Sequence, residues 1–165
     1  MSKIRLASPL QTDSIVDGIG LRLVVWTQGC PHKCEGCHNP ETQDYSGGEV
    51  YDVEAIIEAM NRYSYHDGVT FSGGEPFVQP LPLIEIAKAA RKLDWNVWCY
   101  TGYLYEELLE DPDKLALLKE IDVLIDGPFV MSQKTLAVPF RGSRNQRIID
   151  VKSSLIENRV IESVL

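Results

Sequence analysis

Hydrophobic positions along the chain alternate between short runs typical of buried strands and longer segments with helical spacing. Residues 21–28 (LRLVVWTQ) are rich in β-branched and aromatic side chains and stop at Gly29, which indicates a strand that leads directly into a loop. Residues 51–63 instead place apolar side chains three or four positions apart, with Asp52 as the expected N-cap, which predicts an amphipathic helix. The same order of strand and helix recurs along the chain.

Four further runs are predicted to be strands, and helical segments separate most of them. Helices are expected over residues 81–93, around residues 104–109 and after the start signal Asp111-Pro112. The last segment, residues 152–165, is compatible with either a helix or a strand. The strands are expected at residues 69–72 (VTFS), 96–100 (NVWCY), 121–126 (IDVLID) and 146–151 (QRIIDV).

This alternation predicts an α/β fold with a mostly parallel sheet of five or six strands. In such sheets ligands bind beyond the carboxyl ends of the strands, where the turns at Gly29, Gly73, Gly102 and Gly127 are all expected. A closed eight-stranded barrel needs about 200 residues or more, so we expect a partial (β/α) barrel that is open on one side. Residues 1–165 are expected to form a single domain, with residues 152–165 as a tail outside the recognisable motifs.

Composition and charge narrow the class of protein further. The chain has 165 residues, 44% of them hydrophobic, and a formal net charge of -8, which argues against a nucleic acid as partner. No apolar run approaches the length of a membrane span, and the first residues lack the pattern of a signal peptide. A cytoplasmic protein without a membrane or nucleic-acid partner is therefore expected.

Three of the four cysteines lie within eight positions, as Cys30-x3-Cys34-x2-Cys37. In a reducing compartment such clusters are more often metal ligands or redox groups than disulfides. Thiolates are the usual ligands of iron-sulfur clusters, and three of them leave one iron of a four-iron cluster free for a small molecule. Two alternatives remain: a structural zinc site completed by His32 or His38, and a dithiol redox centre formed by Cys34 and Cys37.

The cysteine spacing, followed by residues 38–40 (HNP), resembles the cluster loop of radical S-adenosylmethionine enzymes, in particular of the glycyl-radical-enzyme activases. The resemblance implies that the three cysteines hold a [4Fe-4S] cluster. It implies that the amino and carboxylate groups of S-adenosylmethionine chelate the fourth iron. It also implies that Gly36 permits close approach of the backbone and that His38 places its ring against the adenine.

Residues 71–76 (FSGGEP) match the GGE turn of the same family. The resemblance implies that Gly73, Gly74 and Glu75 bind the methionyl amino group, since paired glycines let the backbone approach a ligand closely. Asp126, at the end of a predicted strand, is a candidate contact of the nucleoside part of S-adenosylmethionine. Aspartates in that position also form turns, which is the structural alternative for this residue.

Residues 97–103 (VWCYTGY), 122–127 (DVLIDG) and 141–147 (RGSRNQR) narrow the resemblance to activases of the anaerobic ribonucleoside-triphosphate reductase. The resemblance covers about residues 17–151. It implies an enzyme that takes one electron from a low-potential donor, cleaves S-adenosylmethionine and leaves a glycyl radical on the reductase. The implied partners are the glycyl radical subunit of that reductase and the electron donor.

Two other functions compete with this interpretation. An activase of another glycyl radical enzyme, of the pyruvate formate-lyase type, is disfavoured because no acid stands near Thr101 and the carboxyl-terminal half is short. A zinc-stabilised interaction module is the alternative from a different class. Cys99 is expected to be a buried small hydrophobic residue, and residues 141–147 either form a solvated basic loop or dock the reductase.

Overall fold

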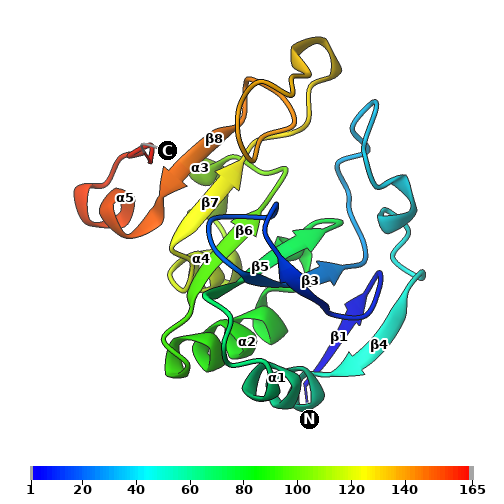
Figure 1. The fold of residues 1–165 in the computed structure, drawn as a ribbon. Coiled ribbons are helices and arrows are strands. Elements are labelled where there is room, and N and C mark those ends of the chain that lie inside the picture. The colour runs from blue at the N-terminus through cyan, green and yellow to red at the C-terminus, as the bar shows by residue number, and fades with distance from the viewer. Residues whose placement is uncertain (1, 164–165) are drawn as a thin grey trace.

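The computed structural model describes residues 2–163, which build one open sheet with helices packed on one of its faces (Figure 1). The strands run in the order β4-β1-β3-β5-β6-β7-β8, and β2 pairs with β3 beside this path. Since β4 and β8 stand at opposite ends of the order, the sheet does not close into a barrel. The strands are β1 Lys3–Leu6, β2 Gln11–Ser14, β3 Arg22–Thr27, β4 Glu49–Asp52, β5 Gly68–Gly73, β6 Asn96–Tyr100, β7 Val123–Asp126 and β8 Arg147–Asp150.

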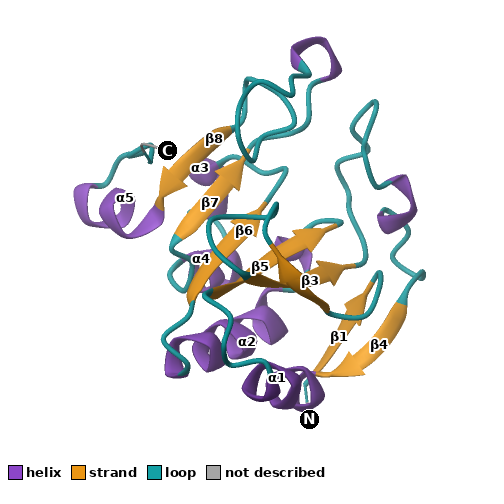
Figure 2. Cartoon of the chain, viewed as in Figure 1, coloured by secondary structure: helices purple, strands orange, loops and turns teal. Residues whose placement is uncertain are grey.

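The four central strands, β3, β5, β6 and β7, are parallel, and helices connect them across one face (Figure 2). α1 (Val53–Arg62) precedes β5, and α2 (Pro80–Lys92) joins β5 to β6. α3 (Tyr105–Leu108) and α4 (Pro112–Leu118) join β6 to β7. All four strands therefore end at the same edge of the sheet, and the loops that follow them meet there.

Side chains of the central strands alternate between two environments, as the pleat of a strand requires. Val97 and Cys99 of β6 are fully buried in the core between the sheet and the helices. Trp98 and Tyr100 of the same strand face the other side, where Trp98 packs with Ile125 in a second, smaller cluster. Cys99 is thus the buried small hydrophobic residue that the sequence predicts, on the face of the sheet that packs against the helices.

The predicted elements of the parallel core are confirmed to within two residues at each end. The strand predicted at residues 96–100 is β6 itself, and the helix predicted over residues 81–93 is α2 at Pro80–Lys92. α4 begins after Asp111, whose side chain accepts hydrogen bonds from the backbone of Asp113 and Lys114. These agreements follow because strand ends and helix starts here carry strong local signals, glycine turns and an aspartate cap.

The sheet has eight strands where the sequence predicted five or six. β1, β2 and β4 were not anticipated, because each has only four residues. β1 and β4 mix charged with apolar side chains, and β2 (QTDS) has no apolar side chain. They extend the parallel centre with antiparallel pairs, and β8 likewise pairs antiparallel with β7. Asp52 precedes α1 as predicted, but its side chain caps no backbone group and instead pairs with Lys3.

The segment after β8 forms α5 (Val151–Glu157), which resolves the ambiguity over residues 152–165 in favour of a helix for its first half. Asp150 caps this helix by accepting a hydrogen bond from the backbone of Ser153 at 3.1 Å. The chain then turns back, and Glu162 bridges to Ile149 of β8. Residues 164 and 165 of the predicted tail lie outside the described residues. No helix within residues 2–163 is long and apolar enough to cross a membrane.

A buried arginine, Arg22, links several segments on the face of the sheet opposite the helices. Arg22 is fully buried, and it donates hydrogen bonds to the Thr70 hydroxyl at 2.7 Å and to the carbonyls of Ile19 and Val69 at 2.8 and 2.9 Å. Its guanidinium lies 5.4 Å from the ring centroid of Trp98. Burial lowers the pKa of Arg22 to about 10, so the side chain is still charged at neutral pH. This contact fixes the loop before β3 to the sheet.

Arg22→Met is expected to lower the free energy of unfolding by about 2–4 kcal/mol, because the apolar chain fills the space but leaves the buried oxygens without a donor. Urea unfolding of the metal-free protein, followed by circular dichroism, measures this. Arg62→Met, at an exposed position on α1, is the matched control and should change the free energy by no more than about 0.5 kcal/mol. Equal effects of the two substitutions would contradict the structural role of Arg22.

Candidate functional site

The cysteine loop leaves the end of β3 and is tied at its base to the chain that returns from it. The Gln28 side chain donates to the carbonyls of Glu41 and Asp44 at 2.9 and 2.6 Å. The backbone of Gly29 and Cys30 donates to the carbonyls of Thr42 and Gln43. The loop is therefore held as a closed unit, and the three cysteines between these ties are presented together.

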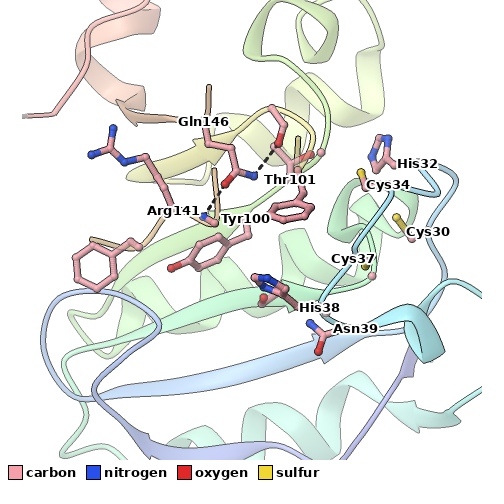
Figure 3. Close-up of a pocket in the computed structure, with 18 of the residues that line it drawn as sticks. Cys30, His32, Cys34, Cys37, His38, Asn39, Tyr100, Thr101, Arg141 and Gln146 are labelled. Atoms are coloured by element: carbon pink, nitrogen blue, oxygen red, sulfur yellow. Dashed lines mark hydrogen bonds between the residues drawn. The ribbon is translucent and has the colours of Figure 1, made fainter. Parts of the chain in front are cut away.

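Cys30, Cys34 and Cys37 are free thiols that line one cavity of about 430 Å³ at the carboxyl edge of the sheet (Figure 3). The cavity continues past Tyr100 and Thr101 of β6 to the chain between β7 and β8. Burial, with the nearby Glu75 carboxylate, raises the pKa of the Cys30 thiol to about 11. Loading of a metal cofactor must therefore displace a proton from this thiol.

The arrangement of these ligands bears on the zinc alternative. Zn–S bonds of about 2.3 Å require the ligands of one zinc ion to lie close together. Among residues 2–163, no three histidine, cysteine or acidic side chains are close enough to share a single ion. His32, a candidate zinc ligand, instead binds Glu75 through Nε2 at 2.6 Å. The three thiols nevertheless line one open cavity together.

The GGE turn packs directly against the start of the cysteine loop. Gly74 and Glu75 donate their backbone N–H groups to the carbonyls of Thr27 and Gly29, both at 2.8 Å. Gly73 has a φ of +103°, and a Cβ there would lie 2.4 Å from the Thr27 carbonyl oxygen. Only glycine fits this position, because both the backbone angle and the contact with β3 exclude a side chain. Gly73 and Gly74 also line the cavity.

The Glu75 carboxylate is fully buried and joins three loops at the edge of the sheet. Oε1 lies 2.6 Å from His32 Nε2 of the cysteine loop and accepts from the Gly102 backbone at 2.7 Å. The Thr101 hydroxyl lies 2.8 and 2.9 Å from the two oxygens, and the Phe77 backbone donates to Oε2 at 3.0 Å. The side chain of Glu75 does not line the cavity, so it acts on the site through the residues that it holds.

The chain between β7 and β8, residues 127–146, forms the opposite wall of the cavity and is here called the β7–β8 loop. The Asn145 side chain donates to the Pro128 carbonyl at 2.8 Å, and Gln146 Nε2 donates to the Gly127 carbonyl at 3.0 Å. Gln146 Oε1 accepts from the Gly142 backbone at 2.8 Å. These amide side chains hold the two ends of the loop together, so hydrogen bonds within the loop fix the shape of the wall.

The β7–β8 loop touches the cysteine loop at two points. The rings of Phe129 and His38 lie 5.0 Å apart between centroids. Gly36 has a φ of +73°, and a Cβ there would lie 2.5 Å from Met131 Cε. The positive φ favours glycine at this position, and the Met131 side chain packs over it, while the role predicted for Gly36 at the ligand stays a prediction. His38 lines the cavity together with Asn39 and Phe129.

Asp126 is fully buried at the end of β7 and does not line the cavity. Its Oδ2 accepts from the Tyr105 backbone at 2.7 Å and from Arg147 Nη2 at 2.5 Å, and its Oδ1 accepts from Arg147 Nε at 3.0 Å. Arg147 also pairs with Glu106 at 2.6 Å. The two carboxylates raise the pKa of Arg147, and the arginine lowers the pKa of Glu106. This group locks β7, β8 and α3 together.

Several residues at the site were not singled out from the sequence. Tyr100 and Thr101 line the cavity, and burial raises the pKa of the Tyr100 phenol, which stays protonated. Phe129 and Gln146 belong to a loop in which only the arginines were considered. The signal that could have found Tyr100 is the period of two along β6, which places it opposite Cys99. The contacts of Phe129 and Gln146 arise between distant segments and have no local signal.

An open α/β sheet with three free cysteines at the carboxyl ends of its parallel strands defines an iron-sulfur protein of the partial-barrel class. The family described as 4Fe-4S single cluster domain matches residues 16–149. The chain is similar to anaerobic ribonucleoside-triphosphate reductase-activating proteins. The one from Haemophilus influenzae is 33% identical, and the match covers 81% of this chain and 90% of that protein. The one from Enterobacteria phage T4 is 35% identical, and the match covers 81% of this chain and 86% of that protein.

The pyruvate formate-lyase-activating enzyme of Clostridium pasteurianum is 38% identical over 68% of this chain, and the match spans 52% of that enzyme. The match to the reductase-activating proteins covers more of both chains. The chain belongs to the radical S-adenosylmethionine family of glycyl-radical-enzyme activases, in the group of the anaerobic ribonucleoside-triphosphate reductase-activating proteins.

Glu75→Gln is expected to lower the free energy of unfolding by about 1–3 kcal/mol. The substitution replaces one carboxylate oxygen, which accepts hydrogen bonds, by an NH₂ group, which then faces the same donors without a bond. Urea unfolding of the metal-free protein measures this. Glu85→Gln on α2 replaces a carboxylate that makes no contact with the loops joined by Glu75, and it serves as the control. A Glu75→Gln protein as stable as the control would show that the buried carboxylate is not what joins the loops.

Thiol labelling of the metal-free protein should separate the cysteines by environment. The raised pKa of Cys30 predicts alkylation about tenfold slower than a free peptide thiol at pH 8.5, with the difference disappearing as the pH passes 11. Cys99 is buried, with its pKa also raised, and should stay unlabelled until the protein unfolds. Iodoacetamide labelling followed by peptide mass spectrometry gives both rates. Rapid labelling of Cys99 in the folded protein would contradict its placement in the core.

Proposed function

We propose that this chain activates the anaerobic ribonucleoside-triphosphate reductase by generating a glycyl radical on it. The chain is an enzyme of the glycyl-radical activase family whose cofactors are a [4Fe-4S] cluster and S-adenosylmethionine. The observation that carries the proposal is that three free thiols share one cavity with the GGE turn, within a chain that matches nine tenths of a reductase-activating protein. The partner follows from the same relatives.

Cys30, Cys34 and Cys37 are proposed to hold the cluster as its three protein ligands. Since a four-iron cluster ordinarily takes four thiolates, three leave one iron accessible from the cavity. When bound, the reduced cluster supplies one electron that cleaves S-adenosylmethionine to methionine and a 5′-deoxyadenosyl radical, which removes a hydrogen atom from a glycine of the reductase. The hydrogen bonds of Gln28 at the base of the loop then keep the three thiolates close to one another.

Gly73 and Gly74 are proposed to bind the methionyl end of S-adenosylmethionine. Both line the cavity, and the N–H groups of Gly74 and Glu75 already donate to the carbonyls of Thr27 and Gly29. An ammonium group is a donor and needs acceptors, so the turn offers carbonyl oxygens to it. His38 is proposed to place its ring against the adenine, supported by its contact with Phe129.

Glu75, Gly36 and Asp126 are proposed to position the site, although the family resemblance suggested that they contact S-adenosylmethionine directly. Both carboxylates are buried and already accept at least three hydrogen bonds. Gly36 allows Met131 to reach the cysteine loop. In this proposal Glu75 orients His32 and β6, and Asp126 orients the start of the β7–β8 loop.

We also propose that a low-potential donor supplies the electron. The protein is proposed to act in the cytoplasm without a membrane or nucleic-acid partner, consistent with its net charge of -8. Residues 1–165 act as one domain, in which α5 and Glu162 pack beside β8. Pyruvate formate-lyase is the competing target, because its activating enzyme in Clostridium pasteurianum is 38% identical over part of the chain.

Cys30→Ala, Cys34→Ala and Cys37→Ala are each expected to lose the cluster, because two thiolates do not hold four irons against solvent. Iron and sulfide are counted after reconstitution without oxygen, and 5′-deoxyadenosine is measured after addition of reductant and S-adenosylmethionine. Cys99→Ala is the matched control and should retain the iron content of the unmodified protein, since Cys99 lies in the core between the sheet and the helices.

The same preparation decides between the candidate functions. A glycyl radical on the anaerobic reductase, seen by electron paramagnetic resonance, supports the proposal, and one formed only on pyruvate formate-lyase overturns the choice of partner. Stoichiometric zinc without cleavage of S-adenosylmethionine would support the interaction module. A cysteine-loop variant that kept its full iron content would contradict the assignment of the ligands.

A further inference from the structure

Besides the cysteines, the cavity is lined by exposed and half-buried apolar and basic side chains. We propose that the entrance of this cavity, formed by Val16, Lys134, Leu136, Phe140 and Arg141, docks an extended segment of the reductase that carries the target glycine. The inference rests on the proposed function and names the surface through which its protein substrate reaches the site. All five residues line the same cavity as the cysteines.

Arg141 marks the end of the cavity that lies opposite the cysteines. Figure 3 shows Arg141 on the far side of Tyr100 from the three cysteines, with its guanidinium directed away from them. The entrance and the cysteines belong to one continuous cavity, so a segment bound at the entrance leads inward past Tyr100. A substrate that is itself a protein needs such an approach, because only one short segment of it fits a cavity of about 430 Å³.

Charge at the entrance differs from that of the rest of the chain. The protein has 24 acidic and 16 basic residues, yet residues 127–146 contain Lys134, Arg141 and Arg144 and no acidic residue. A basic patch on an acidic protein favours a partner surface that offers carboxylates or carbonyl oxygens, and it speeds the encounter with an acidic partner. The β7–β8 side of the entrance is thus complementary to a protein segment rich in oxygen acceptors, while Asp17, next to Val16, also lines the cavity.

The structure distinguishes the arginines of this region from one another. Arg147 donates through Nε and Nη2 to Asp126 and Glu106, so two carboxylates already balance its charge. Arg144 is exposed. Arg141 lines the cavity, and its Nε is buried without a hydrogen-bond partner. An unpaired buried donor is costly, so the Arg141 side chain is expected to shift and give this N–H an acceptor when the complex forms. Of the three arginines in residues 141–147, Arg141 is the docking residue.

Apolar contact area comes from both sides of the entrance. Leu136 is 94% exposed and Val16 is 71% exposed, and they belong to different loops that border the cavity. The Thr135 backbone donates to the Gly142 carbonyl at 3.1 Å, which supports the turn beneath Leu136. The Thr70 hydroxyl donates to the Asp17 carbonyl at 2.9 Å and supports the loop of Val16. Exposed apolar side chains on supported loops are suited to binding, since little order is lost on association.

The test uses the cluster-loaded, full-length protein with the reductase, S-adenosylmethionine and dithionite. Leu136→Asp and Arg141→Met are compared with Ile156→Asp and Arg62→Met, which alter an exposed isoleucine of α5 and an exposed arginine of α1. Glycyl radical formation is followed by electron paramagnetic resonance as the reductase concentration is varied. Cleavage of S-adenosylmethionine without reductase, and iron content, are measured on the same samples.

Each entrance variant is expected to raise the KM for the reductase about tenfold, with the rate of S-adenosylmethionine cleavage in the absence of reductase changed less than twofold. The controls should behave as the unmodified protein. Arg141→Met should also reduce the dependence of KM on salt, because it removes a charge from the interface. Arg141→Lys should restore part of the affinity.

Three results would overturn the proposal. The KM for the reductase could be unchanged, cleavage of S-adenosylmethionine could fall in parallel with radical formation, or the entrance variants could change only the association of the protein with a second copy of itself. Failure of the proposed function is recognised separately, since the unmodified protein would then cleave S-adenosylmethionine without producing a radical on the reductase.

Discussion

The buried carboxylate of Glu75 is the point on which the arrangement of the site depends. It accepts hydrogen bonds from the cysteine loop, from the turn after β5 and from the end of β6, three segments far apart in the sequence. A carboxylate without solvent is tolerable only when its oxygens are fully satisfied, which requires all these donors to stay in place. The same constraint brings Gly102 within close range of His32, where a Cβ would lie 2.5 Å from the ring.

A second constraint is the alternation of side chains along the central strands. It assigns one face of the sheet to the helices and leaves the other for Arg22, Trp98 and Tyr100. Because Cys99 points to the helices, the chain presents three thiols at the cavity and keeps the fourth apart from them. The sheet stays open because its end strands, β4 and β8, do not pair with each other, and loops at the carboxyl edge line the cavity.

The β7–β8 loop connects the cofactor end of the cavity to its entrance. It contacts the cysteine loop through Phe129 and Met131 and carries Leu136 and Arg141 at the other end. Asn145 and Gln146 close its base, and the pairing of Arg147 with Asp126 anchors it to the sheet. One loop thus borders both the cysteines proposed to hold the cluster and the surface proposed to receive the protein substrate.

The sequence by itself determined the parallel strands, their helices and the identity of the cysteine loop. Each of these rests on a local signal, such as a β-branched run before a glycine, helical spacing, or the spacing of three thiols. Only the tertiary structure decided that Glu75 and Asp126 hold loops together, that Gly36 accommodates Met131, and which arginine remains unpaired. It also decided the pairing of the short strands β1, β2 and β4. These features depend on contacts between residues distant in the chain, and the energy of such contacts leaves no pattern in the neighbouring sequence.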